Sequence, residues 1–139
     1  MNGAVPAAVK ILILGGLANI VLSYALGWVL SKHRLRGPMQ PHHWLLVAHT
    51  VSLQEGLLLL GVAFAMLFAK ISDGLAVTGA VLLVAASLFQ DFSGIVNWLR
   101  GTGDQFAEKS TGWVLASINA VLNTAGLAIA TWGVANGLL

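Results

Sequence analysis

Four long apolar stretches dominate this 139-residue chain and limit what it can fold into. A helix that crosses the hydrocarbon core of a bilayer needs about 20 mostly apolar residues, and each stretch reaches that length. We therefore predict an all-α fold, an integral membrane four-helix bundle that forms a single domain over residues 1–139. We expect the first stretch to be a retained helix, since it is too long for a signal peptide and no small-residue cleavage pattern follows it. The expected spans are residues 7–31, 44–69, 75–99 and 112–138.

The composition excludes several classes of protein. Only 9% of the residues are charged, whereas a soluble domain carries about 25%. This excludes an ordinary soluble globule, a disordered segment and a nucleic-acid binder, which needs a basic surface. The chain has no cysteine, which excludes disulfides, zinc–thiolate sites, iron–sulfur clusters and a thiol nucleophile. The expected environment is a membrane, with no nucleic acid as a partner.

The basic residues predict the orientation of the spans. Loops 32–43 and 100–111 hold five of the seven Lys and Arg residues, and with four spans these loops share one side. The positive-inside bias places both loops in the cytoplasm and both termini outside a bacterial-type inner or cell membrane. Pro38 and Pro41 are expected to keep the first loop non-helical. An aromatic belt is expected on the same side from four tryptophans at helix ends: Trp28, Trp44, Trp98 and Trp113.

Three ionisable residues are expected inside the spans, namely His49, Glu55 and Asp91. Such groups are costly in hydrocarbon and are functional candidates by default. From the helical rise, they lie roughly 8, 16 and 12 Å below the side of the membrane that carries the two basic loops. We call this depth the polar layer, because polar residues of all four helices fall near it. Seven further residues are candidates for positioning a substrate: Tyr24, Ser52, Gln54, Asn97, Trp98, Asn119 and Asn123.

Each candidate has a structural alternative. Protonated Glu55 and Asp91 could hydrogen-bond to amides of neighbouring helices, and for Asn119 and Asn123 such helix–helix bonding is the better interpretation. His49 is a poor zinc ligand without other ligands near it, but a buried neutral imidazole suits a single axial ligand of haem. A hydrogen-bonded structural histidine is the alternative. The other histidines are expected to be solvated or near lipid headgroups: His33, His42 and His43.

The sequence AHTVSLQEG at residues 48–56 resembles the second helix of styrene oxide isomerases and hydroxylaminobenzene mutases. Those proteins are small four-helix membrane isomerases, and their motif has a histidine followed six residues later by an amide residue and Gly. The resemblance extends loosely over all four spans. It implies a homotrimer that binds haem b, with the ferric iron near a subunit contact.

The resemblance also implies roles for individual residues. His49 would be the axial ligand of the haem iron. Glu55 stands where the family has its Asn, and Asp91 matches the family's aspartate in the third helix. The family has a tyrosine about two turns further on, where this chain has Trp98 and Leu99, and its only tyrosine is Tyr24.

The function implied is rearrangement of a small hydrophobic substrate, an epoxide to a carbonyl compound, with the substrate entering from lipid. The iron would act as a Lewis acid, and ionised Glu55 or Asp91 would stabilise developing positive charge as catalytic groups. The sister activity is a mutase that converts aryl hydroxylamines to aminophenols, with Glu55 as an acid. Outside this family, the alternatives are a haem-binding electron-transfer subunit, a small transporter and a non-catalytic scaffold.

Overall fold

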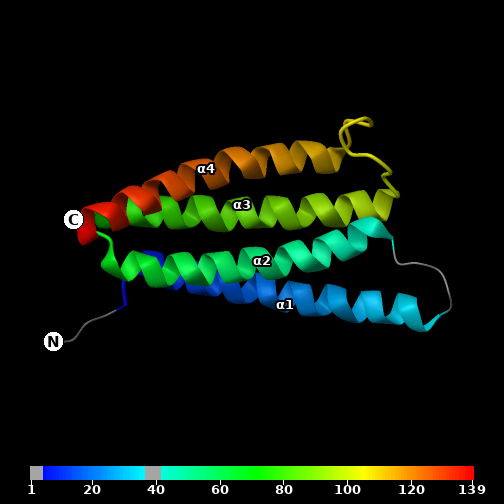
Figure 1. Cartoon of the computed structure of the whole chain (residues 1–139), viewed down its shortest axis with the longest axis horizontal. Helices are drawn as coiled ribbons and strands as arrows, with labels where there is room; N and C mark the ends of the chain where they lie inside the picture. The colour runs from blue at the N-terminus through cyan, green and yellow to red at the C-terminus, as the bar shows by residue number, and fades with distance from the viewer. Residues whose placement is uncertain (1–4, 37–41) are drawn as a thin grey trace.

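The computed structural model describes residues 5–36 and 42–139 and consists of four long helices (Figure 1). Each helix is long and apolar enough to cross a membrane, so the chain is a multi-pass membrane protein. Over the described residues the structure is all-α. The elements are α1 (Ala7–Leu35), α2 (His43–Ala65), the short 3-10 helix η1 (Met66–Phe68), α3 (Asp73–Arg100) and α4 (Thr111–Leu138).

The helices agree with the expected spans except at two ends. Helix α1 continues past its predicted end to Leu35, because its last turn is basic and cations are favourable at a helix C-terminus. Helix α2 ends before its predicted end, at Ala65, where the chain tightens into η1. The first loop therefore begins later than the predicted 32–43. The effect expected from Pro38 and Pro41 lies outside the described residues.

Helices α3 and α4 begin at serine caps. The Oγ of Ser72 accepts a hydrogen bond from the backbone N–H of Leu75, and the Oγ of Ser110 accepts one from that of Trp113. Such caps satisfy backbone donors that have no partner within the helix. The second loop therefore covers the residues between Arg100 and Thr111, close to its predicted bounds.

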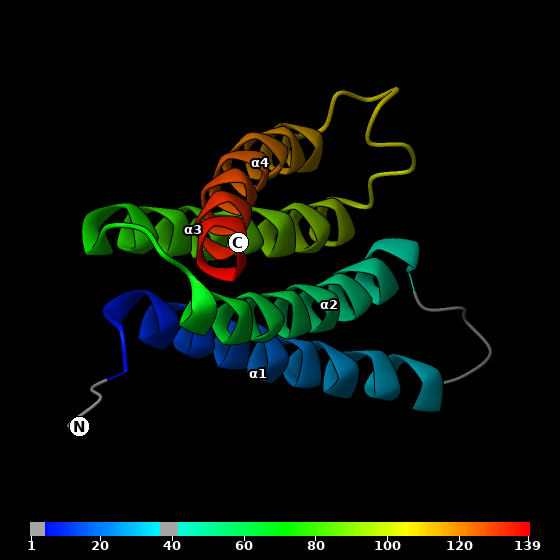
Figure 2. The ribbon, with the colours of Figure 1, turned by 60° about the vertical axis from the view of Figure 1, so that its left-hand side comes forward.

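The four helices do not surround one common core. Helix α3 packs against each of the other three, and α1 packs along α2, whereas α4 packs mainly against α3 and meets η1 near its C-terminal end. Figure 2 shows α4 crossing α3 on the side away from α1. The C-terminal end of α1, the N-terminal end of α2 and the loop between α3 and α4 lie at one end of the molecule (Figure 1). The result is a core of three helices with α4 at its edge.

Two apolar clusters in this core enclose the polar layer. One cluster, with Leu12, Leu59 and Leu83, lies toward the end that carries the termini. The other, with Leu26 and Leu45, lies toward the basic loops. On α1, α2 and α3 alike, buried polar residues stand between the two clusters along the sequence: Asn19, Ser23, Ser52, Ser87 and Asp91. The polar layer is therefore closed off at both ends by packed aliphatic side chains.

Two glycines bring α1 and α2 into close contact beside the polar layer. A Cβ atom added at Gly56 would lie 2.8 Å from the carbonyl oxygen of Gly16, and one added at Gly16 would lie 2.9 Å from that of Gly56. Real Cβ atoms do not approach backbone oxygens so closely. Small residues at such positions let membrane helices pack backbone to backbone. This contact sets the distance between α1 and α2, and hence the space available around His49.

We expect Gly56→Ala to destabilise the protein by about 1–3 kcal/mol, because the added methyl group forces the two backbones apart. Gly61→Ala is the matched control in the same helix, since a Cβ at Gly61 meets nothing within 4 Å. It should leave stability unchanged or raise it by up to about 1 kcal/mol. Unfolding of both variants in detergent measures the difference, and equal stability would contradict the proposed contact.

Candidate functional site

His49 and Ser23 join α1 to α2 through a reciprocal pair of hydrogen bonds. The Nδ1 atom of His49 lies 2.8 Å from the backbone carbonyl oxygen of Ser23. In return, the Oγ of Ser23 donates to the backbone carbonyl oxygen of His49 at 2.8 Å, and it also lies 3.1 Å from Nδ1. Ser23 is buried, whereas His49 is half-buried. The imidazole is therefore held at its inner nitrogen and open at its outer edge.

This geometry determines the tautomer of the neutral imidazole. A carbonyl oxygen can only accept a hydrogen bond, so Nδ1 carries the proton and donates it to Ser23. The lone pair then resides on Nε2, which takes part in no hydrogen bond among the residues that the structure describes. Histidines that bind metals usually donate their other ring N–H to a carboxylate or a backbone carbonyl in this way. His49 thus has the chemistry of a preoriented ligand.

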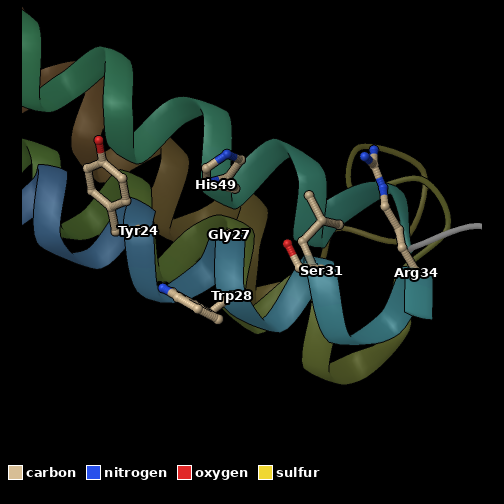
Figure 3. Close-up of a pocket in the computed structure, with 7 residues that line it drawn as sticks. Tyr24, Gly27, Trp28, Ser31, Arg34 and His49 are labelled. Carbon is tan, nitrogen blue, oxygen red and sulfur yellow. The ribbon is translucent and has the colours of Figure 1, made fainter. Parts of the chain in front are cut away.

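The His49 ring lies in a pocket on the outer face of α1 with a volume of about 390 Å³ (Figure 3). Gly27 is directly beneath the ring: a Cβ there would lie 3.1 Å from His49 Cε1. Tyr24 and Trp28 are largely exposed and stand on the same side of α1, while Arg34 closes the end toward the basic loops. We call this space the His49 pocket. It opens on the surface that faces the membrane, as a site for a hydrophobic ligand must.

The two expected catalytic carboxyl groups lie outside the His49 pocket: Glu55 belongs to α2 and Asp91 to α3. The Oγ of Ser52 donates a hydrogen bond of 2.6 Å to Oδ1 of Asp91, and both residues are fully buried. The other carboxyl oxygen of Asp91, Oδ2, is buried without a hydrogen-bond partner among the described residues. Glu55 is half-buried and lies near enough for its charge to interact with Asp91. The structure therefore brings Ser52, Glu55 and Asp91 together.

The carboxyl groups and His49 lie on opposite sides of the buried face of α2. Ser52 points into the core, and at about 100° per residue His49 and Glu55 are each turned about 60° from it, in opposite directions. His49 thus faces α1, and Glu55 lies on the other side of Ser52, toward α3. One chain holds the imidazole and the carboxyl groups at similar depth but does not bring them to one point.

The other candidate positioning residues have varied surroundings. Asn97 is buried at the basic end, where it donates to Gln105 and accepts from Ser110, so it holds the second loop in place. Trp98 packs on the apolar cluster of Leu26 and Leu45. Asn119 donates to Gln90 of α3 at 2.8 Å. Three residues complete the set: Gln54 is exposed, Asn123 is half-buried, and Tyr24 is in the His49 pocket.

On the α1 side of the pocket, the sequence analysis identified Tyr24 but not Gly27, Ser31 or Arg34. Tyr24, Gly27, Ser31 and Arg34 are spaced by three, four and three residues, a spacing that places them on one face of a helix. That spacing is visible in the sequence, but a glycine and a serine on a membrane helix do not by themselves indicate a binding site. Ser23 was likewise visible only as one hydroxyl among several. Which of them meets His49 depends on how α1 is rotated against α2.

Metal ligands other than His49 do not gather in the fold. Among the residues that the structure describes, no group of three or more His, Asp or Glu side chains could hold a metal ion. The loop histidines are exposed, as the sequence indicated. His42 accepts a hydrogen bond from the backbone N–H of Trp44, and His33 lies edge-on to Trp98. The described residues therefore offer no group of side chains that would chelate an ion.

The fold and this site define a four-span membrane protein with one oriented histidine in a pocket that opens on the outer surface of the helices. Comparison with known proteins finds no relative: no protein-family model matches the chain, and neither a curated protein nor a solved structure matches it.

We expect Ser52→Ala to destabilise the protein by about 1–3 kcal/mol, because it removes the only hydrogen bond that a described residue gives to the buried Asp91 carboxyl. Ser117→Ala serves as the control. Ser117 is exposed on α4 and bonds only to the Trp113 carbonyl of its own helix, so its loss should change stability by no more than about 0.5 kcal/mol. Equal effects of the two substitutions on unfolding in detergent would rule out a role for the Ser52–Asp91 bond.

Proposed function

We propose that this protein is a haem-dependent membrane isomerase that rearranges a small hydrophobic epoxide to a carbonyl compound. The observation that carries the proposal is the His49 pocket, in which Nδ1 is bound to the Ser23 carbonyl and Nε2 is left with its lone pair. The resemblance of residues 48–56 to the styrene oxide isomerases supports the same conclusion. Ferric haem b is the proposed cofactor, and a homotrimer is the proposed assembly.

The residues of the pocket fit a haem group. Gly27 and Ser31 leave a shallow surface beside the imidazole, over which a flat ring can lie. Tyr24 and Trp28 offer aromatic side chains at its edge. His49 would hold the iron through Nε2, the ring nitrogen that has no hydrogen-bond partner among the described residues. Bound in this way, the haem would supply a Lewis acid for the epoxide oxygen.

The rest of the chemistry depends on the surroundings. Opening of an epoxide followed by a 1,2-hydride shift needs no water and no redox partner, and exclusion of water protects the cationic species formed on the way. A pocket within the membrane excludes water without a lid. Ionised Glu55 or Asp91 would stabilise the developing positive charge. An aryl hydroxylamine could occupy the same site, so a mutase is the alternative function.

We assign Glu55 to a substrate bound at a neighbouring subunit. Glu55 is turned about 120° from His49 around α2, so within one chain it is directed away from the His49 pocket. In a cyclic trimer each contact joins two different faces of the chain. A contact that joins the α1 side of one subunit to the α3 side of the next would bring the half-buried Glu55 to its neighbour's His49 pocket, whereas the fully buried Asp91 stays bonded to Ser52 in its own core.

We expect the protein purified from haem-supplied cells to show a Soret absorption band, and His49→Ala to lose both the band and epoxide isomerisation. The matched control is His43→Ala, which removes an exposed histidine at the start of the same helix. Incubation with an epoxide and with an aryl hydroxylamine separates the two activities. Full activity of His49→Ala, or a wild-type protein without a Soret band, would overturn the proposal.

A second pair of variants tests the pocket without removing the ligand. Gly27→Leu should abolish haem binding, because the added Cβ lies 3.1 Å from His49 Cε1 and the larger side chain pushes the imidazole ring out of its position. Ala25→Leu adds the same group to an exposed position of α1 that does not line the His49 pocket and should bind haem normally. Equal haem binding by both variants would place the cofactor somewhere else.

Mixed trimers test the assignment of Glu55 across a subunit contact. His49→Ala and Glu55→Gln chains are each expected to be inactive alone. If each site takes His49 from one chain and Glu55 from the next, co-expression in equal amounts should restore about a quarter of the wild-type activity, since every mixed cyclic trimer has one intact site. If one chain supplies both residues, no mixed trimer has an intact site and activity stays absent.

A further inference from the structure

One face of α1 extends from the His49 pocket to the basic end of the molecule. It begins at Tyr24, continues over Gly27 and Ser31, and ends at Arg34 (Figure 3). Trp28 and Leu30 line the pocket beside this row of residues with large side chains, whereas Gly27 and Ser31 within the row are small. These two small residues form a shallow surface directly beside the His49 ring. The face thus has small residues beside the imidazole and a cation at its end toward the basic loops.

Arg34 is the only cationic residue that lines the pocket among the described residues. The last turn of α1 also contains Lys32 and His33. At 100° per residue both are directed away from the face that Arg34 shares with Gly27, and the His33 ring lies edge-on to Trp98 of α3. Arg34 is exposed, so its guanidinium donors are free to bind an anionic group at the pocket mouth.

The position of Arg34 suits the shape of a haem. Haem is a flat ring with iron at its centre and two carboxylates on one edge. Those carboxylates are too costly to leave inside hydrocarbon, so their edge must point to the membrane surface. Arg34 follows Gly27 by seven residues, a distance of about 10 Å along the helix axis. A guanidinium therefore lies toward the surface at the end of a ring centred beside His49.

We propose that Arg34 binds the propionate carboxylates of the haem and so fixes which edge of the ring faces the membrane surface. This inference rests on the proposed haem binding at His49 and adds the orientation of the cofactor to it. The planar guanidinium can bind a carboxylate through two parallel hydrogen bonds. Lysine offers only a point charge in its place.

The test measures haem affinity by Soret titration in neutral detergent, with haem and with haem dimethyl ester, whose carboxylates are uncharged. Arg34→Gln should bind haem about five to ten times more weakly than the wild type, a modest factor because the pair is exposed. The wild type should bind the ester more weakly by a similar factor. Arg34→Gln should bind haem and ester equally well. The haem affinity of Arg34→Lys should lie between those of the wild type and Arg34→Gln. Arg36→Gln, which removes an exposed cation outside the pocket, should keep the preference for haem over the ester.

The outcomes separate this inference from the proposed function. If the wild type binds haem through His49 but Arg34→Gln still prefers haem to the ester, Arg34 does not bind the propionates and only this inference fails. If Arg34→Gln lowers the affinity for haem and for the ester by the same factor, Arg34 acts through the fold, and again only this inference fails. If Arg34→Gln leaves haem affinity unchanged, the guanidinium meets a lipid headgroup or water instead. If the wild type shows no absorption that depends on His49, both proposals fall.

Discussion

The interior of a membrane offers no water to polar groups, and this constraint determines most side-chain contacts in the protein. Each buried polar residue of the layer must find its partner on its own or a neighbouring helix. Asn19 of α1 donates to Ser87 of α3, and Ser52 of α2 donates to Asp91 of α3. The three-helix core is thus joined at one depth by hydrogen bonds and above and below it by aliphatic packing. Such polar contacts fix the rotation of each helix, which apolar packing against lipid alone leaves weakly defined.

The same constraint explains why His49 is suited to bind a ligand. The imidazole has two nitrogens, and the Ser23 carbonyl satisfies the one that points inward. Ser23 reaches this position because Gly16 and Gly56 let α1 and α2 approach closely. The outer nitrogen then has no partner from its own chain among the described residues, at a depth where water is scarce. The proposed haem would bind through this nitrogen and so satisfy its lone pair.

The sequence was sufficient to predict the helices but not the contacts between them. Apolar length predicts four spans, and helical rise predicts the depth of His49, Glu55 and Asp91, since both depend on one helix at a time. The partner of each group depends on two helices and on their rotation, so Ser23 could not be chosen over other hydroxyls near the same depth. Asn97 illustrates this difference. Its type and position made it a candidate for substrate contact, whereas in the structure it holds loop residues Gln105 and Ser110.

Polar groups on the outer surface support the proposed homotrimer. Gln54 is exposed in the middle of α2 and Tyr24 in the middle of α1, where lipid tails would leave an amide and a phenol unsatisfied. Both side chains could be satisfied by a neighbouring subunit. Glu55 is half-buried and lies on the opposite side of the buried face of α2 from His49. A cyclic contact that covers the α1 side of one subunit with the α3 side of the next would therefore have two effects. It would shelter exposed polar groups from lipid, and it would complete around His49 a site for which one chain provides only half of the groups.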